Sequence, residues 1–228
     1  MKNKVMKKKK IIIIVIVVLI IGIFAAFLLN NTNKKEEVKF PCDLDDGKLT
    51  VNSIFQSSID NPDCNDKYED DIASLEIVNN SDKLLEEADI TVETDEKTLT
   101  FHIESLPAKK TMWVFESKNQ TITLDENYFN INVESKYNDQ TLGTDKLDIT
   151  VETYQTEVTI KNKTPQDMKD ISLNFHTKFE EILYGGKIYH YQINELKANE
   201  SAKVDVLEAS LGTPEAVQIN INDKGEEE

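Results

Sequence analysis

The chain has 228 residues and a formal net charge of −16, with 42 acidic residues against 26 basic ones. Six lysines lie in the first ten positions, so residues 1–30 carry +6 and the remaining residues carry −22. Binding to nucleic acid needs clustered cations, and docking on anionic lipid needs a basic surface. We therefore expect no nucleic-acid partner for the acidic region, and no attachment of its surface to anionic lipid.

An unbroken apolar run of 19 residues fills positions 11–29, directly after the lysines. At about 1.5 Å per residue, a helix of this run reaches roughly 28 Å, close to the hydrocarbon thickness of a bilayer. A single segment in lipid must bond its own backbone groups, which favours a helix even where β-branched residues dominate. The sequence thus predicts a cytoplasmic tail over 1–10 and a transmembrane helix over 11–29, with the lipid bilayer as its partner.

A cleaved signal peptide is the alternative interpretation of this run. The apolar region of a signal peptide normally has about 7–15 residues and ends in a small-x-small cleavage site. Here the run is longer, and its small pair, Ala25-Ala26, has a phenylalanine on each side. Lysines predominate before the run and mixed charges follow it, which predicts a cytoplasmic N-terminus and an exported region of roughly 200 residues.

The exported region contains an internal repeat. Residues 74–81 (Ser-Leu-Glu-Ile-Val-Asn-Asn-Ser) match residues 157–164 (Glu-Val-Thr-Ile-Lys-Asn-Lys-Thr) with an offset of 83. The apolar positions of residues 99–108 match those of residues 189–198 with an offset of 90. The second copy therefore has a loop that is longer by seven residues, which we place around residues 179–186.

Both copies alternate apolar and polar residues in short segments between turn residues, which is typical of antiparallel strands. Six or seven such strands in about 80–90 residues is the pattern of an immunoglobulin-like β-sandwich. We predict an all-β ectodomain of two tandem immunoglobulin-like β-sandwich domains after one N-terminal transmembrane α-helix; one continuous sandwich built by both copies is the alternative. The predicted limits are a linker over 30–46, domains over 47–138 and 144–223, and an acidic tail over 224–228.

Cys42 and Cys64 are the only cysteines, and the predicted topology places both outside the cell. An exported pair of this kind most simply forms a disulfide. This disulfide would close a loop of about 22 residues and contribute roughly 3 kcal/mol in the chain-entropy model. The loop around Cys64 is acidic, with Asp60, Asp63, Asp66, Glu69, Asp70 and Asp71. It lacks the spacing and central glycine of an EF-hand, so we interpret it as a solvated loop, with weak cation binding as the alternative.

Trp113 and Phe115 differ from their counterparts in the second copy, which are the charged residues Lys203 and Asp205. In the repeat register their neighbours Met112 and Val114 point into the core, so strand alternation predicts that both aromatic side chains point outward. Exposed adjacent aromatic residues often form a contact surface, and we therefore treat Trp113 and Phe115 as a candidate contact patch. The alternative is that they pack against the other domain, or that a bulge turns them inward.

No catalytic, cofactor-binding or metal site is predicted. The chain has no Gly-x-Ser-x-Gly, no glycine-rich phosphate loop and no His-Glu-x-x-His motif, so we expect a non-enzymatic protein. His176 and His190 would face each other in a hairpin centred near Leu183. Two imidazoles with no third ligand make only a weak zinc hypothesis, and surface histidines are the preferred interpretation.

Several core and turn segments carry a family resemblance. Residues 75–81 (Leu-Glu-Ile-Val-Asn-Asn-Ser), 98–103 (Thr-Leu-Thr-Phe-His-Ile), 106–108 (Leu-Pro-Ala) and 114–116 (Val-Phe-Glu) resemble small membrane-anchored proteins of Gram-positive Firmicutes. Those proteins carry tandem immunoglobulin-like modules after an N-terminal anchor. The resemblance implies a fold and a location at the cell membrane, and it carries no functional residues with it.

The expected function follows from the topology and the absence of catalytic motifs. We expect a membrane-anchored extracytoplasmic protein that acts in protein–protein interaction or as a scaffold of the cell envelope. The alternative is an extracellular sensory or regulatory subunit that binds a ligand or a divalent cation and acts through a membrane partner.

Overall fold

The computed structural model describes residues 37–60, 68–123, 125–139, 146–151, 156–206 and 212–221. The lysine-rich tail and the apolar run lie outside these ranges, so the transmembrane helix stays a prediction. Within the described ranges, no helix is both long and apolar enough to cross a membrane.

The regular structure of the described residues is almost entirely β-strand. In the first copy the strands are β1 (Cys42–Leu44), β2 (Leu49–Asp60), β3 (Tyr68–Asn79), β4 (Leu84–Thr94), β5 (Thr98–Leu106), β6 (Thr111–Phe115) and β7 (Tyr128–Asn138). In the second copy they are β8 (Leu147–Val151), β9 (Glu157–Asn162), β10 (Met168–Phe179), β11 (Ile182–Leu196), β12 (Ser201–Asp205) and β13 (Thr213–Ile221). A single 3-10 turn, η1 (Asp45–Gly47), follows β1. The prediction of an all-β region is therefore confirmed for this part of the chain.

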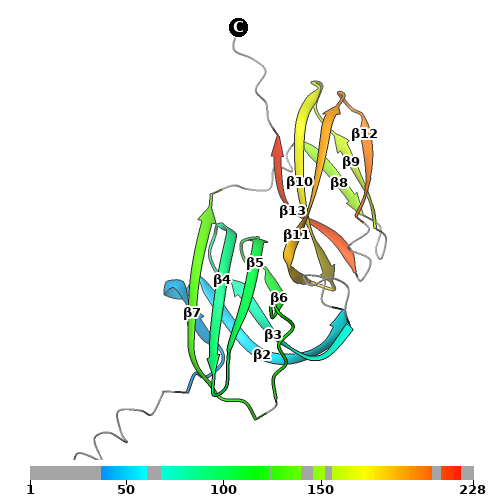
Figure 1. Cartoon of the computed structure of the whole chain (residues 1–228). Coiled ribbons are helices and arrows are strands. Elements are labelled where there is room, and N and C mark those ends of the chain that lie inside the picture. Colours follow the sequence, from blue (N-terminus) through cyan, green and yellow to red (C-terminus); the bar gives the residue numbers. More distant parts are fainter. Residues whose placement is uncertain are drawn as a thin grey trace, which may run out of the picture. The chain divides into compact units, whose positions relative to one another are not determined.

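The strands form three sheets, and Figure 1 labels their strands except β1. The largest has the order β1-β2-β3-β6-β11-β10-β13 and contains strands of both copies. Each copy also has a three-stranded sheet, β5-β4-β7 in the first and β12-β9-β8 in the second. This set of sheets is consistent with a β-sandwich.

Two clusters of buried apolar side chains form the core. The first is built almost entirely from β2 to β6, but it also includes Leu183 and Val217 from the second copy. The second cluster contains only residues of the second copy, among them Ile160, Leu173 and Phe175. Burial alternates along β4 and most of β5, as expected when one face of a strand packs on the core and the other meets water. The separate clusters favour two domains, whereas the shared seven-stranded sheet favours one continuous sandwich. The limits of the two domains therefore stay predictions.

Equivalent buried asparagines show that the repeat is structural. Asn79 Nδ2 donates to the carbonyl oxygen of Leu106 at 2.9 Å, and Asn162 Nδ2 donates to that of Leu196 at 3.1 Å. Asn79 and Asn162 are 83 positions apart, and Leu106 and Leu196 are 90 positions apart. These are the two offsets that the sequence comparison predicts. Each asparagine side chain is fully buried. It links the turn after its own strand to the last residue of the second strand of the following hairpin, β5 or β11.

The seven extra residues of the second copy extend a hairpin and do not form a separate loop. They lengthen β10 and β11, which remain paired as far as Phe179 and Ile182 at the turn. The first residues of β11 then run parallel to β6, with Leu183 opposite Met112 and Tyr184 opposite Trp113. This short parallel pairing joins the two copies into one seven-stranded sheet.

Candidate recognition surface and the junction between the copies

Cys42 is half buried on β1 and packs against the first core cluster. Burial raises the pKa of the Cys42 thiol, and the nearby Asp43 carboxylate raises it further, because both disfavour a thiolate. Cys64 lies outside the described residues, so the disulfide stays a prediction. Residues 61–67 of the acidic loop also lie outside them, whereas Glu69, Asp70 and Asp71 belong to strand β3, so the predicted loop is shorter than expected.

The disulfide prediction has a direct chemical test. In the denatured full-length protein, we expect neither cysteine to react with a maleimide before reduction and both to react after it. Reduction should lower the free energy of unfolding by roughly 3 kcal/mol, because the 22-residue loop is no longer closed in the unfolded chain. Mass spectrometry counts the labelled thiols, and labelling of both without reductant would show that the cysteines are not paired.

Phe115 is not exposed, although strand alternation predicts that it points outward. Only 1% of its surface is accessible, because Tyr184 of the second copy covers it with the two ring centroids 4.9 Å apart at 65°. The ring therefore does point away from its own core, but β11 lies beside β6 and buries it. The alternative that this aromatic side chain packs against the other copy agrees with the structure.

Trp113 remains half buried on the outer side of the seven-stranded sheet. Its ring meets the Phe55 ring edge to face, with centroids 5.5 Å apart, and its Nε1 donates to Glu76 Oε2 at 3.2 Å. Asn52 Nδ2 donates to the other carboxylate oxygen, Glu76 Oε1, at 2.8 Å. Two donors thus hold one carboxylate beside two partly exposed aromatic rings.

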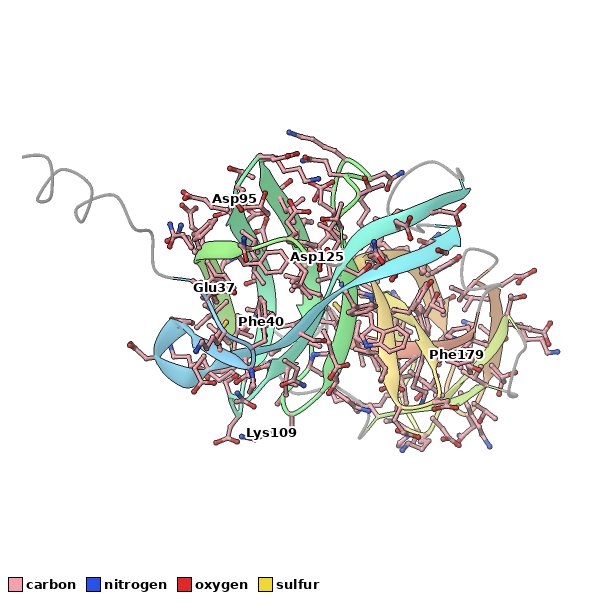
Figure 2. All side chains as sticks on the ribbon, turned by 90° about the horizontal axis from the view of Figure 1, so that it is seen from below. Glu37, Phe40, Asp95, Lys109, Asp125 and Phe179 are labelled. Atoms are coloured by element: carbon pink, nitrogen blue, oxygen red, sulfur yellow. The ribbon has the colours of Figure 1, made fainter. Side chains whose placement is uncertain are left out.

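We call Phe55, Glu76 and Trp113 the aromatic–acidic surface. It lies on β2, β3 and β6, and cross-strand pairing holds its backbone in place, since Glu76 is directly opposite Trp113. Figure 2 shows β2 and β3 as the long blue and cyan strands of the first copy. A carboxylate beside aromatic faces can bind a cation through charge and through the ring quadrupoles.

The junction between the copies contains buried polar contacts as well as the aromatic pair. His176 is fully buried, and its Nε2 lies 2.6 Å from the backbone oxygen of Glu104, so this nitrogen donates to that carbonyl. The Glu104 carboxylate in turn accepts a hydrogen bond from the Ile188 amide, with Oε2 and N separated by 3.1 Å. Both contacts cross from the second copy to the first.

Glu215 adds an ion-pair group at the same junction. Its Oε1 lies 2.9 Å from Lys110 Nζ of the first copy, and its Oε2 lies 2.6 Å from Lys178 Nζ. Burial by itself raises the pKa of the Glu215 carboxyl, but the hydrogen bonds from Lys178 and Lys110 outweigh burial and hold the pKa below its ordinary value. Glu215 therefore stays ionised at neutral pH and links the copies.

The two histidines of the zinc hypothesis do not face each other. Opposite His190 lies Asn174, whose Oδ1 is 2.8 Å from His190 Nδ1. The hairpin turns between Phe179 and Ile182 and not near Leu183, and a bulge shifts the register on either side of His176. His176 instead contacts the Glu104 carbonyl of the first copy, so the expected pairing of the two histidines across the hairpin is wrong.

A different histidine lies among carboxylates. Glu87 and Asp89 on β4 and His102 on β5 offer ligand atoms that all lie within 4.8 Å of one another. His102 Nδ1 is 2.8 Å from Asp89 Oδ1, and His102 Nε2 is 3.3 Å from Glu104 Oε1. Burial opposes charge on the imidazole, but these carboxylates outweigh it and raise the pKa of His102. Sequence reasoning missed this cluster because its members come from two strands, and only strand register brings them together.

Outside the aromatic–acidic surface, the described residues expose little apolar surface. Phe179, labelled in Figure 2 on the second copy, is 48% exposed and is the only large hydrophobic side chain that is exposed among the described residues. A single exposed aromatic ring at a hairpin turn is common in soluble domains and does not by itself indicate a binding site.

Comparison of the chain with protein-family models and with curated protein sequences gives no match in either case.

Proposed function

We propose that this chain is a membrane-anchored extracytoplasmic protein without enzymatic activity, which binds a partner protein of the cell envelope through the aromatic–acidic surface. The first of two tandem immunoglobulin-like copies carries that surface, and the N-terminal residues 11–29 hold both copies at the cell membrane. The run of lysines before an apolar stretch of 19 residues supports the anchor and its orientation. The equivalent strands and asparagine turns of the two copies support the tandem arrangement.

The observation that carries the binding proposal is the Glu76 carboxylate between Trp113 and Asn52. Its two oxygens are oriented by hydrogen bonds, so little entropy remains to be lost when a cation arrives. The rings of Phe55 and Trp113 lie beside it and remain partly accessible. A lysine or arginine side chain of a partner can therefore meet a charge and an aromatic face together.

Charge also favours a basic partner segment. The residues after position 30 carry −22, which attracts a cationic segment over a long distance and repels an acidic one. The occupant that we propose for the surface is therefore a lysine- or arginine-bearing segment of an envelope protein.

Trp113 is the only tryptophan of the chain, so its fluorescence reports directly on this surface. Titration of the full-length protein in detergent micelles with a short lysine- and arginine-rich peptide should give a saturable change in emission. A glutamate-rich peptide of the same length should give none. Phe55→Ala and Glu76→Gln should each weaken binding about tenfold, which corresponds to the roughly 1.4 kcal/mol of a cation held by a charge or an aromatic face.

Glu195→Gln is the matched control, because it removes the same charge from an exposed position of the second copy. It should leave the affinity for the basic peptide unchanged. An equal loss for Glu195→Gln and Glu76→Gln would mean that the peptide only senses net charge, and the proposed surface would be wrong. In cells, a photo-crosslinker at position 55 should capture a basic segment of an envelope protein, and one at position 203, on β12 of the second copy, should not.

A further inference from the structure

The three-stranded sheet β5-β4-β7 carries an unusual arrangement of charge on its outer side. Asp89 lies directly opposite Glu134 on β7, and Glu87 lies directly opposite Glu104 on β5. Like charges directly opposite each other on neighbouring strands destabilise a sheet. Two such pairs in adjacent rows therefore cost stability unless a cation lies between them.

A lysine on β7 offsets only part of this cost. Lys136 is directly opposite Glu87 on β7, yet its Nζ lies 2.9 Å from Glu86 Oε2. His102 is directly opposite Asp89, with one ring nitrogen toward Asp89 and the other toward Glu104. The imidazole thus lies among the acidic side chains and can supply a nitrogen ligand to a metal ion.

The second copy shows that the fold does not need these charges. Its strands pair in the same way, with Ser172 opposite Gln192 where the first copy has Asp89 opposite His102. On the other side, Ser172 is opposite Asn220, where Asp89 is opposite Glu134. The equivalent row of the second copy is therefore polar and uncharged, although the core positions of the two copies match.

We propose that Glu87, Asp89 and His102 bind a divalent transition-metal ion such as Zn²⁺ on the outer side of the β5-β4-β7 sheet. One imidazole and two carboxylates form a mixed nitrogen and oxygen donor set, which suits zinc and its neighbours better than calcium or magnesium. Their ligand atoms already lie within 4.8 Å of one another, so small side-chain rotations bring them to a common ion. The ion would also offset the repulsion between the opposed carboxylates.

The proposed site lies beside the junction of the copies. Glu104, which contacts the His102 ring, accepts the hydrogen bond from the Ile188 amide of the second copy. The backbone oxygen of His102 lies against Gly186, where an added Cβ would be 1.9 Å away. A metal ion on His102 would therefore fix the strand against which the second copy packs.

Zinc binding to the untagged full-length protein in micelles can be measured by competition with a chromophoric chelator. We expect one zinc ion per chain, and we expect His102→Ala and Asp89→Asn each to weaken binding at least tenfold. His190→Ala is the matched control, since it removes an imidazole from the second copy, and it should leave zinc affinity unchanged. Zinc should also raise the unfolding temperature of the wild type but not of His102→Ala.

Two further variants keep the proposal falsifiable if His102→Ala fails to fold. In metal-free protein, Glu134→Gln should raise the unfolding temperature, because it removes one opposed carboxylate without touching the proposed ligands. In the second copy, Ser172→Asp combined with Gln192→His should add a second equivalent of bound zinc, because Asp170 already stands at the position equivalent to Glu87. The proposal is overturned if the wild type binds no zinc at millimolar concentration, or if His102→Ala and His190→Ala bind it equally.

Discussion

Replacing Asn79 by alanine is expected to lower the free energy of unfolding by about 3 kcal/mol, because buried hydrogen-bond partners lose their donor and acceptor together. Asn79 Nδ2 donates to the carbonyl oxygens of Lys83 at 2.9 Å and of Leu106 at 2.9 Å, and its Oδ1 accepts from the Ser81 hydroxyl at 2.7 Å. Alanine leaves the buried Leu106 carbonyl without this donor and deprives the Ser81 hydroxyl and the Ser81 amide of their acceptor. Urea unfolding followed by circular dichroism measures the loss.

The chain supplies both a duplicate and a control for this experiment. Asn162→Ala removes the equivalent bonds of the second copy and should cost a similar amount, since Thr164 and Leu196 take the places of Ser81 and Leu106. Asn80→Ala changes the exposed neighbour, whose Nδ2 donates to Thr50 Oγ1 at 2.7 Å, and should cost less than about 1 kcal/mol. Equal losses for Asn79→Ala and Asn80→Ala would contradict the role assigned to the buried turn.

Gly186→Ala is expected to separate β11 from the first copy. The new Cβ would lie 1.9 Å from the His102 backbone oxygen and 3.1 Å from Val114 Cγ2, and a backbone atom cannot move aside as a flexible side chain can. The loss of packing should cost about 3 kcal/mol or more. Tyr184 would then no longer cover Phe115, and the nearby Trp113 would become more accessible to water, so its emission should shift to longer wavelength.

Gly47→Ala is the matched control for this substitution. A Cβ at Gly47 meets nothing within 4 Å, and only its positive φ of 81° is unfavourable, which costs about 1 kcal/mol. Limited proteolysis should cut Gly186→Ala between the copies faster than the wild type and should treat Gly47→Ala like the wild type. If Gly186→Ala keeps the wild-type emission and proteolysis pattern, the second copy does not depend on this close approach.

For the candidate contact patch, alternation predicts the side of the strand but not the exposure of the side chains. The sequence predicts which side of β6 Trp113 and Phe115 occupy, because the side-chain period along a strand is two. Whether that side meets water depends on the neighbouring strand. β11 comes about 70 residues later in the chain and covers Phe115 with Tyr184, while Trp113 stays partly accessible beside Phe55. No local pattern contains that information.

Glu116 shows the same limit for a charged residue. In an acidic chain, its sequence context gives no reason to expect anything but an exposed carboxylate, yet its side chain is fully buried. Its carboxylate accepts hydrogen bonds from the backbone amides of Lys118 at 2.7 Å and Gln120 at 2.8 Å, and from that of Thr100 at 3.1 Å. Val206, also buried, stands at the equivalent position of the second copy. The charge is satisfied only by a turn and a strand that fold around it.

The all-β character of the described region and the presence of two copies follow from the amino-acid sequence alone, including the offsets of 83 and 90 that the asparagine turns confirm. Alternation and turn residues depend on only a few neighbouring positions, so strands and turns can be predicted from them without knowledge of the tertiary structure. Three features depend on tertiary packing: the seven extra residues extend β11 to β6, Tyr184 covers Phe115, and His102 lies beside Asp89. These contacts join residues that are distant in sequence. They depend on the register between strands, which in turn depends on the packing of the whole sheet.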